Sequence, residues 1–170
     1  SGVLWRLAER QRLTFLGVSA RFLHSLAAQD LSPKSYVNLA DLRTIASTGS
    51  PLSPSGFRYV YEHVKTDVHL ASIAGGTDVV GCFMAGVPIS PVFAGQIQGP
   101  TLGVDLVALN NRGELVIGEP GELVIRQPMP SMPLNFWDDP NGRKYRNAYF
   151  TIFEGLWRHG DLIELTSNQG

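Results

Sequence analysis

The sequence predicts a mixed α/β protein, with a partial parallel α/β sheet subdomain followed by a β-barrel-like subdomain. Up to about residue 90, helical patterns alternate with short apolar runs, which is typical of a parallel sheet covered by helices. Beyond Gly86, proline and glycine become frequent and short apolar runs follow one another closely, which indicates a small barrel or distorted sheet. We therefore expect one subdomain over 1–90 and a second over 91–170.

The elements of the first half follow from apolar spacing and from capping residues. Leu4 and Leu7 share one face of an opening helix. Ser19 and Ser53 are N-cap residues, and Pro54 suits the first position of a helix. The resulting elements are helices at 20–29 and 54–64 and strands at 13–18, 42–46 and 68–73.

Short strands and one long loop are expected in the second half. The segment 110–113, with two asparagines and a glycine, is typical of a tight hairpin turn. The loop at 129–147 carries Trp137 and several charges, and its length favours a functional role or short helices inside it. The expected strands are 104–109, 114–117 and 122–126.

Composition and charge indicate which classes of binding partner are not expected and in which cellular compartment the protein is expected. The 170 residues carry 14 basic and 15 acidic side chains for a net charge of −1, without a basic block. Neither nucleic acid nor an anionic membrane is therefore an expected partner. No apolar run is long enough to cross a bilayer. A single cysteine, Cys82, excludes an intrachain disulfide and suggests a reducing, cytoplasmic location.

Two stretches in the first half could carry chemistry, and each also has a plainer interpretation. The segment 47–51 follows a predicted strand, so its main-chain groups would lie at the carboxyl edge of a parallel sheet, where α/β folds bind ligands. The alternative is a strand-to-helix turn capped by Ser53. The segment 75–78 joins two glycines, which permit close approach of a ligand, to Thr77 and Asp78, which could bond a phosphate and hold Mg²⁺. The alternative is an ordinary turn.

A third stretch, 156–162, crowds Trp157, His159 and Asp161 before an apolar run. A carboxylate fixed just before a strand can accept two hydrogen bonds from a vicinal diol such as a ribose. A solvated turn is the alternative, although tryptophan and histidine add little to such a turn. If the first two loops leave the same edge of one sheet, they face a common crevice, and the sequence then predicts a site for a charged, phosphorylated ligand.

Several motifs together make the chain similar to a known superfamily. The segment 42–52 resembles the superfamily's adenine-binding segment, and 74–78 lies where its members have Tyr-Gly-x-Thr-Glu. The segment 121–126 matches a strand motif of the superfamily, and 157–162 resembles its Trp-x-x-Thr-Gly-Asp-Leu motif. These are motifs of the adenylate-forming superfamily of acyl-CoA synthetases, luciferases and peptide-synthetase adenylation domains, and they imply the fold of its large N-terminal domain. The chain further resembles the branch that activates acetoacetate, over segments 72–78, 95–98, 136–139 and 144–150.

The resemblance implies a two-step reaction and a role for each matched residue. A carboxylate, acetoacetate in this branch, attacks the α-phosphorus of ATP, and coenzyme A then displaces AMP to give the thioester. Thr77 would bond the α-phosphate and Asp78 would hold Mg²⁺, which makes them the implied catalytic pair. Asp161 would bind the ribose hydroxyls. The other implied nucleotide contacts are Gly49, Ser50 and Pro51 at the adenine, with Ala74, Gly75 and Gly76.

Some positions depart from the superfamily pattern or bear on the substrate. Ala74 replaces an aromatic residue that stacks on adenine, Asp78 stands where most members have a longer glutamate, and His159 replaces a threonine. Gly75 would border the acyl pocket, where acetate-specific members carry a tryptophan, and it leaves room for a longer acid such as acetoacetate. A ligase for another short 3-oxo or branched acid, or a non-catalytic nucleotide-binding fragment, remains as the alternative.

The chain resembles a central part of such a ligase. The superfamily's phosphate loop would precede Ser1, and its hinge, small C-terminal domain and catalytic lysine would follow Gly170. We therefore expect the 170-residue chain by itself neither to adenylate acetoacetate nor to form the thioester. The measurement is acetoacetate-dependent exchange of pyrophosphate into ATP, and exchange catalysed by the purified chain would contradict this expectation.

Overall fold

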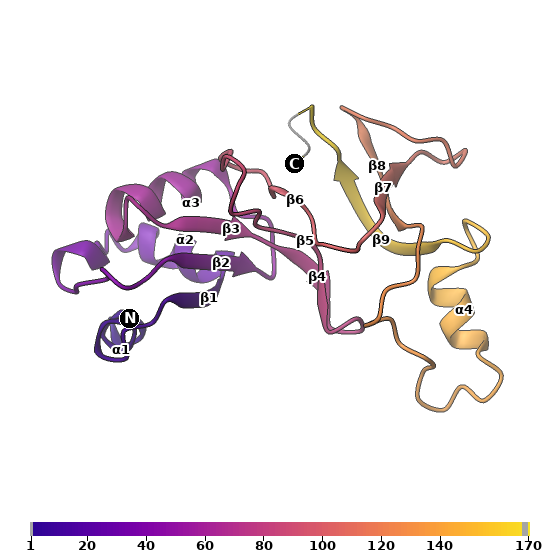
Figure 1. Cartoon of the computed structure of the whole chain (residues 1–170), viewed down its shortest axis with the longest axis horizontal. Coiled ribbons are helices and arrows are strands. Elements are labelled where there is room, and N and C mark those ends of the chain that lie inside the picture. The colour runs from indigo at the N-terminus through magenta and orange to yellow at the C-terminus, as the bar shows by residue number, and fades with distance from the viewer. Residues whose placement is uncertain (1, 168–169) are drawn as a thin grey trace. The chain divides into compact units, whose positions relative to one another are not determined.

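The computed structural model describes residues 2–167 and 170, which form two compact units (Figure 1). The first unit consists of Ser1–Ala74 and Met84–Gly99, and the second consists of Gly75–Phe83 and Pro100–Gly170. The chain thus passes between the units more than once. The linear boundary expected near residue 90 stays a prediction.

A parallel sheet forms the centre of the first unit, as the alternating pattern predicted. Its strands lie in the order β1 (Phe15–Ser19), β2 (Thr44–Thr48) and β3 (His69–Ser72), and both pairings are parallel. Ile45 in the middle strand is level with Leu16 on one side and Leu70 on the other. All three side chains are buried in the core of this unit. The mixed α/β fold class is therefore confirmed here.

The helices of the first unit begin where the capping residues predicted. The Ser19 Oγ accepts a hydrogen bond from the Phe22 N–H at 3.1 Å, and the Ser53 Oγ accepts one from the Gly56 N–H at 3.2 Å. These caps open the second and third helices. The helical elements are α1 (Val3–Arg10), a 3₁₀ turn (Pro33–Ser35), α2 (Ala20–Ala28), α3 (Pro54–Tyr59) and a π-helical turn (Val60–Val64).

The Gln98 side chain ties a proline-containing loop to the sheet of the first unit. Its Nε2 donates to the carbonyl oxygens of Val87, Ser90 and Pro91 at 3.0, 2.8 and 3.2 Å. Its Oε1 accepts from the Val87 N–H at 3.1 Å and lies 2.6 Å from the His69 Nε2 in β3. Because this oxygen is an acceptor for Val87, the His69 nitrogen acts as its donor. One amide therefore satisfies polar groups of one loop and of one strand.

The second unit contains an antiparallel sheet. Its strands lie in the order β7 (Leu106–Leu109), β8 (Pro120–Ile125) and β9 (Trp157–Glu164). The long loop predicted at 129–147 does contain the start of a short helix, α4 (Arg143–Tyr149), which lies beside β9 (Figure 1). The buried residues Val107, Leu109 and Val124 form a small core with Phe153 and Leu156 packed against it.

One predicted strand of this unit is wrong. The segment 114–117 is not a strand, and only Leu115 forms a single bridge, to Leu109. The predicted turn before it is present, because the Gly113 N–H donates to the Asn110 carbonyl at 2.9 Å. The ladder stops because Gly118, at a φ of 75°, turns the chain toward β8. The apolar pattern of 114–117 does not indicate this turn, because the glycine that makes it lies just after the pattern.

Three further short strands contain the points where the chain passes from one unit to the other. They are β4 (Ala74–Gly76), β5 (Gly81–Ala85) and β6 (Gly99–Pro100). Within the residues that the structure describes, no helix combines the length and the apolar character needed to span a membrane.

Replacing Gln98 with alanine should destabilise the protein much more than the same change at an exposed glutamine. The loss removes the partner of His69 and of the Ser90 and Pro91 carbonyl groups, whereas the Val87 carbonyl still accepts from the Ser90 N–H. This should cost on the order of 2–4 kcal/mol in the free energy of unfolding. Gln29 is the matched control, because its side chain is exposed and bonds only to the nearby Ser25. Urea denaturation of Gln98→Ala and Gln29→Ala measures both, and equal losses would contradict the proposed role of Gln98.

Candidate functional site

The carboxyl ends of β2 and β3 lie at the same edge of the parallel sheet, as expected. The Ile73 N–H, just beyond β3, donates to the Ser47 carbonyl at 2.8 Å, so the two strand ends are adjacent. Gly49 follows β2 with a φ of 83°, a conformation that favours glycine. Gly49, Ser50 and Pro51 are exposed. The first predicted segment therefore presents an open loop at the edge where α/β sheets bind ligands.

Ser47 differs from the rest of that segment. Its side chain is fully buried, and its Oγ has no hydrogen-bond partner within the described part of the chain. It stands between Val18 and Ser72 in the neighbouring strands. The ligand-accessible portion of the segment therefore excludes Ser47 and consists of residues 48–51, all of which are exposed.

The second predicted segment forms the end of β4 and a turn at 77–80 within the second unit. Gly75 has no room for a side chain, because a Cβ there would overlap the Gly81 carbonyl oxygen and lie 2.7 Å from the Cys82 Cα. A Cβ on Gly76 would overlap the Asp78 carboxylate. The two glycines are therefore required by backbone and carboxylate packing. The turn interpretation and the ligand interpretation are compatible, because the turn leaves Thr77 exposed and Asp78 half-buried.

The Asp78 carboxylate is held at both of its oxygens. Oδ1 accepts a hydrogen bond from the Val79 N–H at 3.1 Å, and Oδ2 accepts one from the Tyr149 hydroxyl. Both donors are uncharged, so neither places a positive charge beside the carboxylate. The arrangement fixes the direction of an acidic group beside the exposed hydroxyl of Thr77.

The third predicted segment lies in a β-bulge rather than before a strand. Across β8 and β9, Val124 is paired with Arg158 and Glu122 with Leu162, so the three residues 159–161 stand opposite Leu123 alone. The expectation that Asp161 precedes a strand is therefore wrong. Gly160, at a φ of 100°, permits the bulge, and a bulge re-aims side chains away from the regular ladder.

The bulge gives its two polar residues different surroundings. The Asp161 side chain is 69% exposed, whereas that of His159 is only 13% exposed. The His159 ring packs edge-on against Phe83 with centroids 4.5 Å apart, and its Nε2 lies 3.7 Å from the Asp161 Oδ2. A Cβ on Gly76 would lie 3.1 Å from the His159 ring. The second and third predicted segments therefore meet within the second unit.

An ion pair braces the strand on which the bulge lies. The Arg158 guanidinium donates to both carboxylate oxygens of Glu122, at 2.9 and 2.7 Å. These hydrogen bonds raise the pKa of Arg158 above its ordinary value. The contact links the two family-like segments 121–126 and 157–162, which are neighbouring strands.

An aromatic cluster surrounds the Tyr149 ring. Tyr149 stacks on Trp157 with centroids 3.6 Å apart and an interplanar angle of 14°, and the Trp157 side chain is 1% exposed. The edges of Phe136, Tyr145 and Phe150 pack around this pair. Burial, and then the hydrogen bond to Asp78, raise the pKa of Tyr149 well above its ordinary value, so the phenol stays protonated.

Asp139 fixes the helix that carries Tyr149. Its two carboxylate oxygens accept hydrogen bonds from the N–H groups of Lys144 and Tyr145, at 3.0 and 2.9 Å, in the first turn of α4. The bond from Tyr145 makes the largest contribution to lowering the pKa of Asp139. Such a cap is favourable because the first N–H groups of a helix lack partners within it.

Sequence reasoning missed two residues of this arrangement. Tyr149 appeared only within the family-like segment 144–150, and His159 was named in the third stretch and as a departure from the family pattern, without a role of its own. Aromatic residues spaced along 136–150 were the available signal, but nothing local pairs Tyr149 with a carboxylate 71 positions away. Among the described residues, no group of three or more His, Cys, Asp and Glu side chains is arranged to hold a metal ion.

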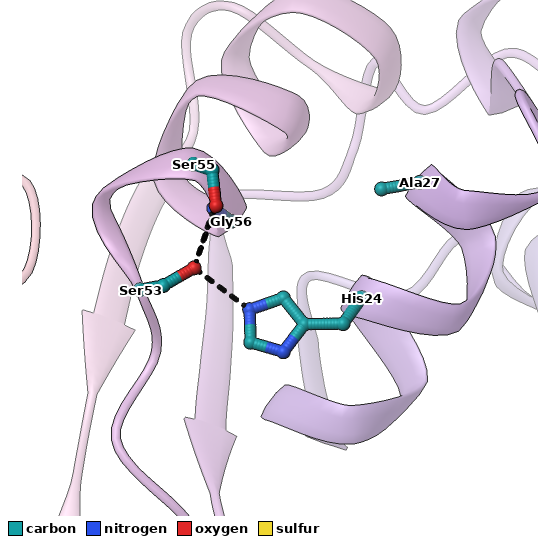
Figure 2. A pocket seen from close by; sticks show the side chains of 5 residues that line it. All are labelled: His24, Ala27, Ser53, Ser55 and Gly56. Carbon is teal, nitrogen blue, oxygen red and sulfur yellow. Dashed lines mark hydrogen bonds between the residues drawn. The ribbon is translucent and has the colours of Figure 1, made fainter.

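A shallow pocket in the first unit holds a hydrogen-bonded serine–histidine pair (Figure 2). The His24 Nε2 lies 3.0 Å from the Ser53 Oγ, which lies 2.8 Å from the Ser55 Oγ. The Ser53 Oγ also accepts from the Gly56 N–H as the cap of α3. No carboxylate is present among the described residues that line this pocket. A hydrolase triad is therefore not formed, and the pair serves the junction of α2 and α3.

Comparison with known proteins relates the whole chain to acyl-CoA synthetases. A model of the AMP-binding enzyme family matches residues 1–133. An acetoacetyl-coenzyme A synthetase of Rhizobium meliloti (strain 1021) is 48% identical over 168 residues, which are 99% of this chain and 26% of that protein. The chain therefore spans about a quarter of the length of the curated relatives that it matches.

Solved structures agree with this relationship. Acetoacetyl-CoA synthetase from Streptomyces lividans matches with a TM-score of 0.89 at 43% identity, over 97% of this chain and 26% of that one. The anthranilate CoA ligase AuaEII matches with a TM-score of 0.77 at 21% identity, over 97% of this chain and 30% of that one, which supports the fold alone. The resemblance drawn from the motifs is confirmed, and the chain belongs to the AMP-binding enzyme family.

Proposed function

We propose that the chain is part of an ATP-dependent ligase that activates acetoacetate as an acyl-adenylate and transfers it to coenzyme A. In the first step the carboxylate displaces pyrophosphate from ATP. In the second step the thiol of coenzyme A displaces AMP, and its proton leaves to solvent. The relatives named acetoacetyl-coenzyme A synthetase support this substrate class. The observation that carries the proposal is the fixed Asp78 carboxylate beside the exposed Thr77.

Phosphoryl chemistry of this kind depends on positioning and charge neutralisation rather than on a protein nucleophile. In our proposal the Thr77 hydroxyl donates to an α-phosphate oxygen, and Asp78 holds Mg²⁺. A carboxylate has about four lone-pair sites, so the bonds from Val79 and Tyr149 leave acceptor capacity on Asp78. Mg²⁺ commonly binds one or two carboxylates together with substrate phosphates, so a single carboxylate fits it. The ion would offset the negative charge of the phosphates.

We assign the remaining contacts with the nucleotide to sequence-predicted residues on the basis of their exposure or their small side chains. We assign the ribose hydroxyls to Asp161, because its carboxylate is largely exposed on the bulge and can accept from a diol. The open loop formed by Gly49, Ser50 and Pro51 is assigned to the adenine. Ala74, Gly75 and Gly76 are assigned to the nucleotide through their backbone, since none of them carries a large side chain.

The acid substrate is the finer part of this proposal. Gly75 leaves space where acetate-specific members carry tryptophan, but the Gly81 carbonyl already forbids a side chain at this position. The glycine is therefore weaker support for acetoacetate than its place in the motif suggests. A ligase for another short 3-oxo or branched acid is consistent with the same residues.

A substrate panel on the native protein in its full length tests the function. We expect ATP–pyrophosphate exchange to be fastest with acetoacetate, and slower with acetate, other 3-oxo acids and branched acids of similar length. Two acids that differ by one methylene group in a hydrophobic pocket typically differ roughly 10- to 200-fold in kcat/KM. A faster branched or other 3-oxo acid would replace acetoacetate as the substrate. No exchange with any acid would favour a non-catalytic nucleotide-binding protein.

Replacing Asp78 with asparagine should lower exchange on the order of 10²-fold, because a metal-binding charge is lost while the side-chain shape is kept. Asp138→Asn is the matched control: it removes the same charge in the second unit, at an exposed residue with a φ of 52° that asparagine tolerates. Exchange is measured over a range of Mg²⁺ concentrations. Equal behaviour of the two variants would remove Asp78 from the proposed site.

A further inference from the structure

Tyr149 makes the one side-chain hydrogen bond to Asp78 found within the described residues. Its hydroxyl donates to Oδ2, while the neighbouring Val79 N–H donates to Oδ1 at 3.1 Å. A carboxylate held at one oxygen can still rotate about its Cβ–Cγ bond. Donors on both oxygens remove that freedom, so the remaining lone pairs point in fixed directions.

The tyrosine is itself rigidly held. Its side chain is 9% exposed, and the stack on Trp157 restricts the ring from one face. Phe136 and Tyr145 contact the ring edge-on, at centroid distances of 5.7 and 5.6 Å. Asp139 caps the helix on which Tyr149 lies. The hydroxyl therefore has a defined position, and no reorganisation is needed for it to reach Asp78.

We propose that Tyr149 is a positioning residue that orients the Asp78 carboxylate toward the magnesium–nucleotide complex. This inference rests on the proposed function of the same site. A phenol suits the task because it donates a hydrogen bond without adding positive charge, whereas lysine or arginine would neutralise the carboxylate. Outer hydrogen bonds of this kind hold ligating carboxylates in many metal sites, and their loss typically costs 10- to 100-fold in affinity or activity.

Two other roles for Tyr149 give different experimental results. The ring could serve packing alone, in which case the hydroxyl is dispensable. The hydrogen bond could also compete with the cation for Asp78, in which case its removal would strengthen cation binding. Tyr149→Phe separates these roles, because it deletes the hydroxyl and leaves the ring to stack on Trp157.

The experiment measures Mn²⁺ binding, as a substitute for Mg²⁺, to the native full-length protein saturated with α,β-methylene-ATP. Electron paramagnetic resonance of free Mn²⁺ gives the dissociation constant without any turnover. We expect Tyr149→Phe to raise this constant about tenfold. Tyr145→Phe is the matched control, because Tyr145 lies on the same helix and in the same aromatic cluster, while the donors to Asp78 among the described residues are Val79 and Tyr149.

A second measurement distinguishes positioning from packing. In an Asp78→Asn background, Tyr149→Phe should cause no further loss of Mn²⁺ affinity, because the hydroxyl acts through the carboxylate. Thermal melts of all variants report stability separately. The proposal is overturned if Tyr149→Phe leaves Mn²⁺ affinity unchanged, if it tightens binding, or if it weakens binding equally in the Asp78→Asn background.

The two proposals can fail independently. If no acid in the substrate panel supports ATP–pyrophosphate exchange but Tyr149→Phe weakens Mn²⁺ binding as expected, the ligase function fails and the positioning role stands. If acetoacetate supports exchange but the Mn²⁺ titrations of Tyr149→Phe and of the unaltered protein coincide, the ligase function stands and the role of Tyr149 fails.

Discussion

The burial of Trp157 is the constraint on which the second unit depends. The indole is 1% exposed, its backbone pairs with Ile125 across the sheet, and its ring stacks on Tyr149. Aromatic pairs contribute roughly 0.5–1.5 kcal/mol beyond the burial of their surface. One side chain thereby fixes the end of α4 and the start of β9. The donor to Asp78 and the bulge that carries Asp161 lie on either side of it in the chain.

Glycines in the second unit set where other groups can lie. Gly75 allows the backbone of Gly81 to approach, Gly76 leaves space for the Asp78 carboxylate, and Gly160 permits the bulge. A neighbouring backbone explains Gly75, a neighbouring carboxylate explains Gly76, and a positive φ explains Gly160. In a nucleotide-binding family, the same lack of side chains also allows a phosphate to approach main-chain groups. Packing within the protein and ligand binding therefore both favour glycine at these positions, and a sequence motif alone cannot tell which of the two reasons applies.

The segments that resemble acetoacetate-activating relatives assemble around one contact. Phe136 and Tyr145 come from two of these segments and pack on each other with centroids 5.4 Å apart. Asp139 of the first segment caps the helix formed by the second. Their shared effect is to support Tyr149, which reaches the carboxylate of a third segment. The segments that resemble acetoacetate-activating relatives therefore hold Tyr149 and, through it, Asp78, and this role needs no direct contact with a substrate.

The sequence by itself determined the features that depend on near neighbours. Ser19 and Ser53 cap their helices, three apolar runs form the parallel sheet, and 110–113 makes a turn, because periodicity, capping and turn chemistry act over a few residues. Family motifs also named Thr77, Asp78 and Asp161 as candidates. Only the tertiary structure decided the rest. The bulge at Asp161, the failure of 114–117 to form a strand and the bond from Tyr149 depend on strand register and on packing between distant segments, which no local pattern encodes.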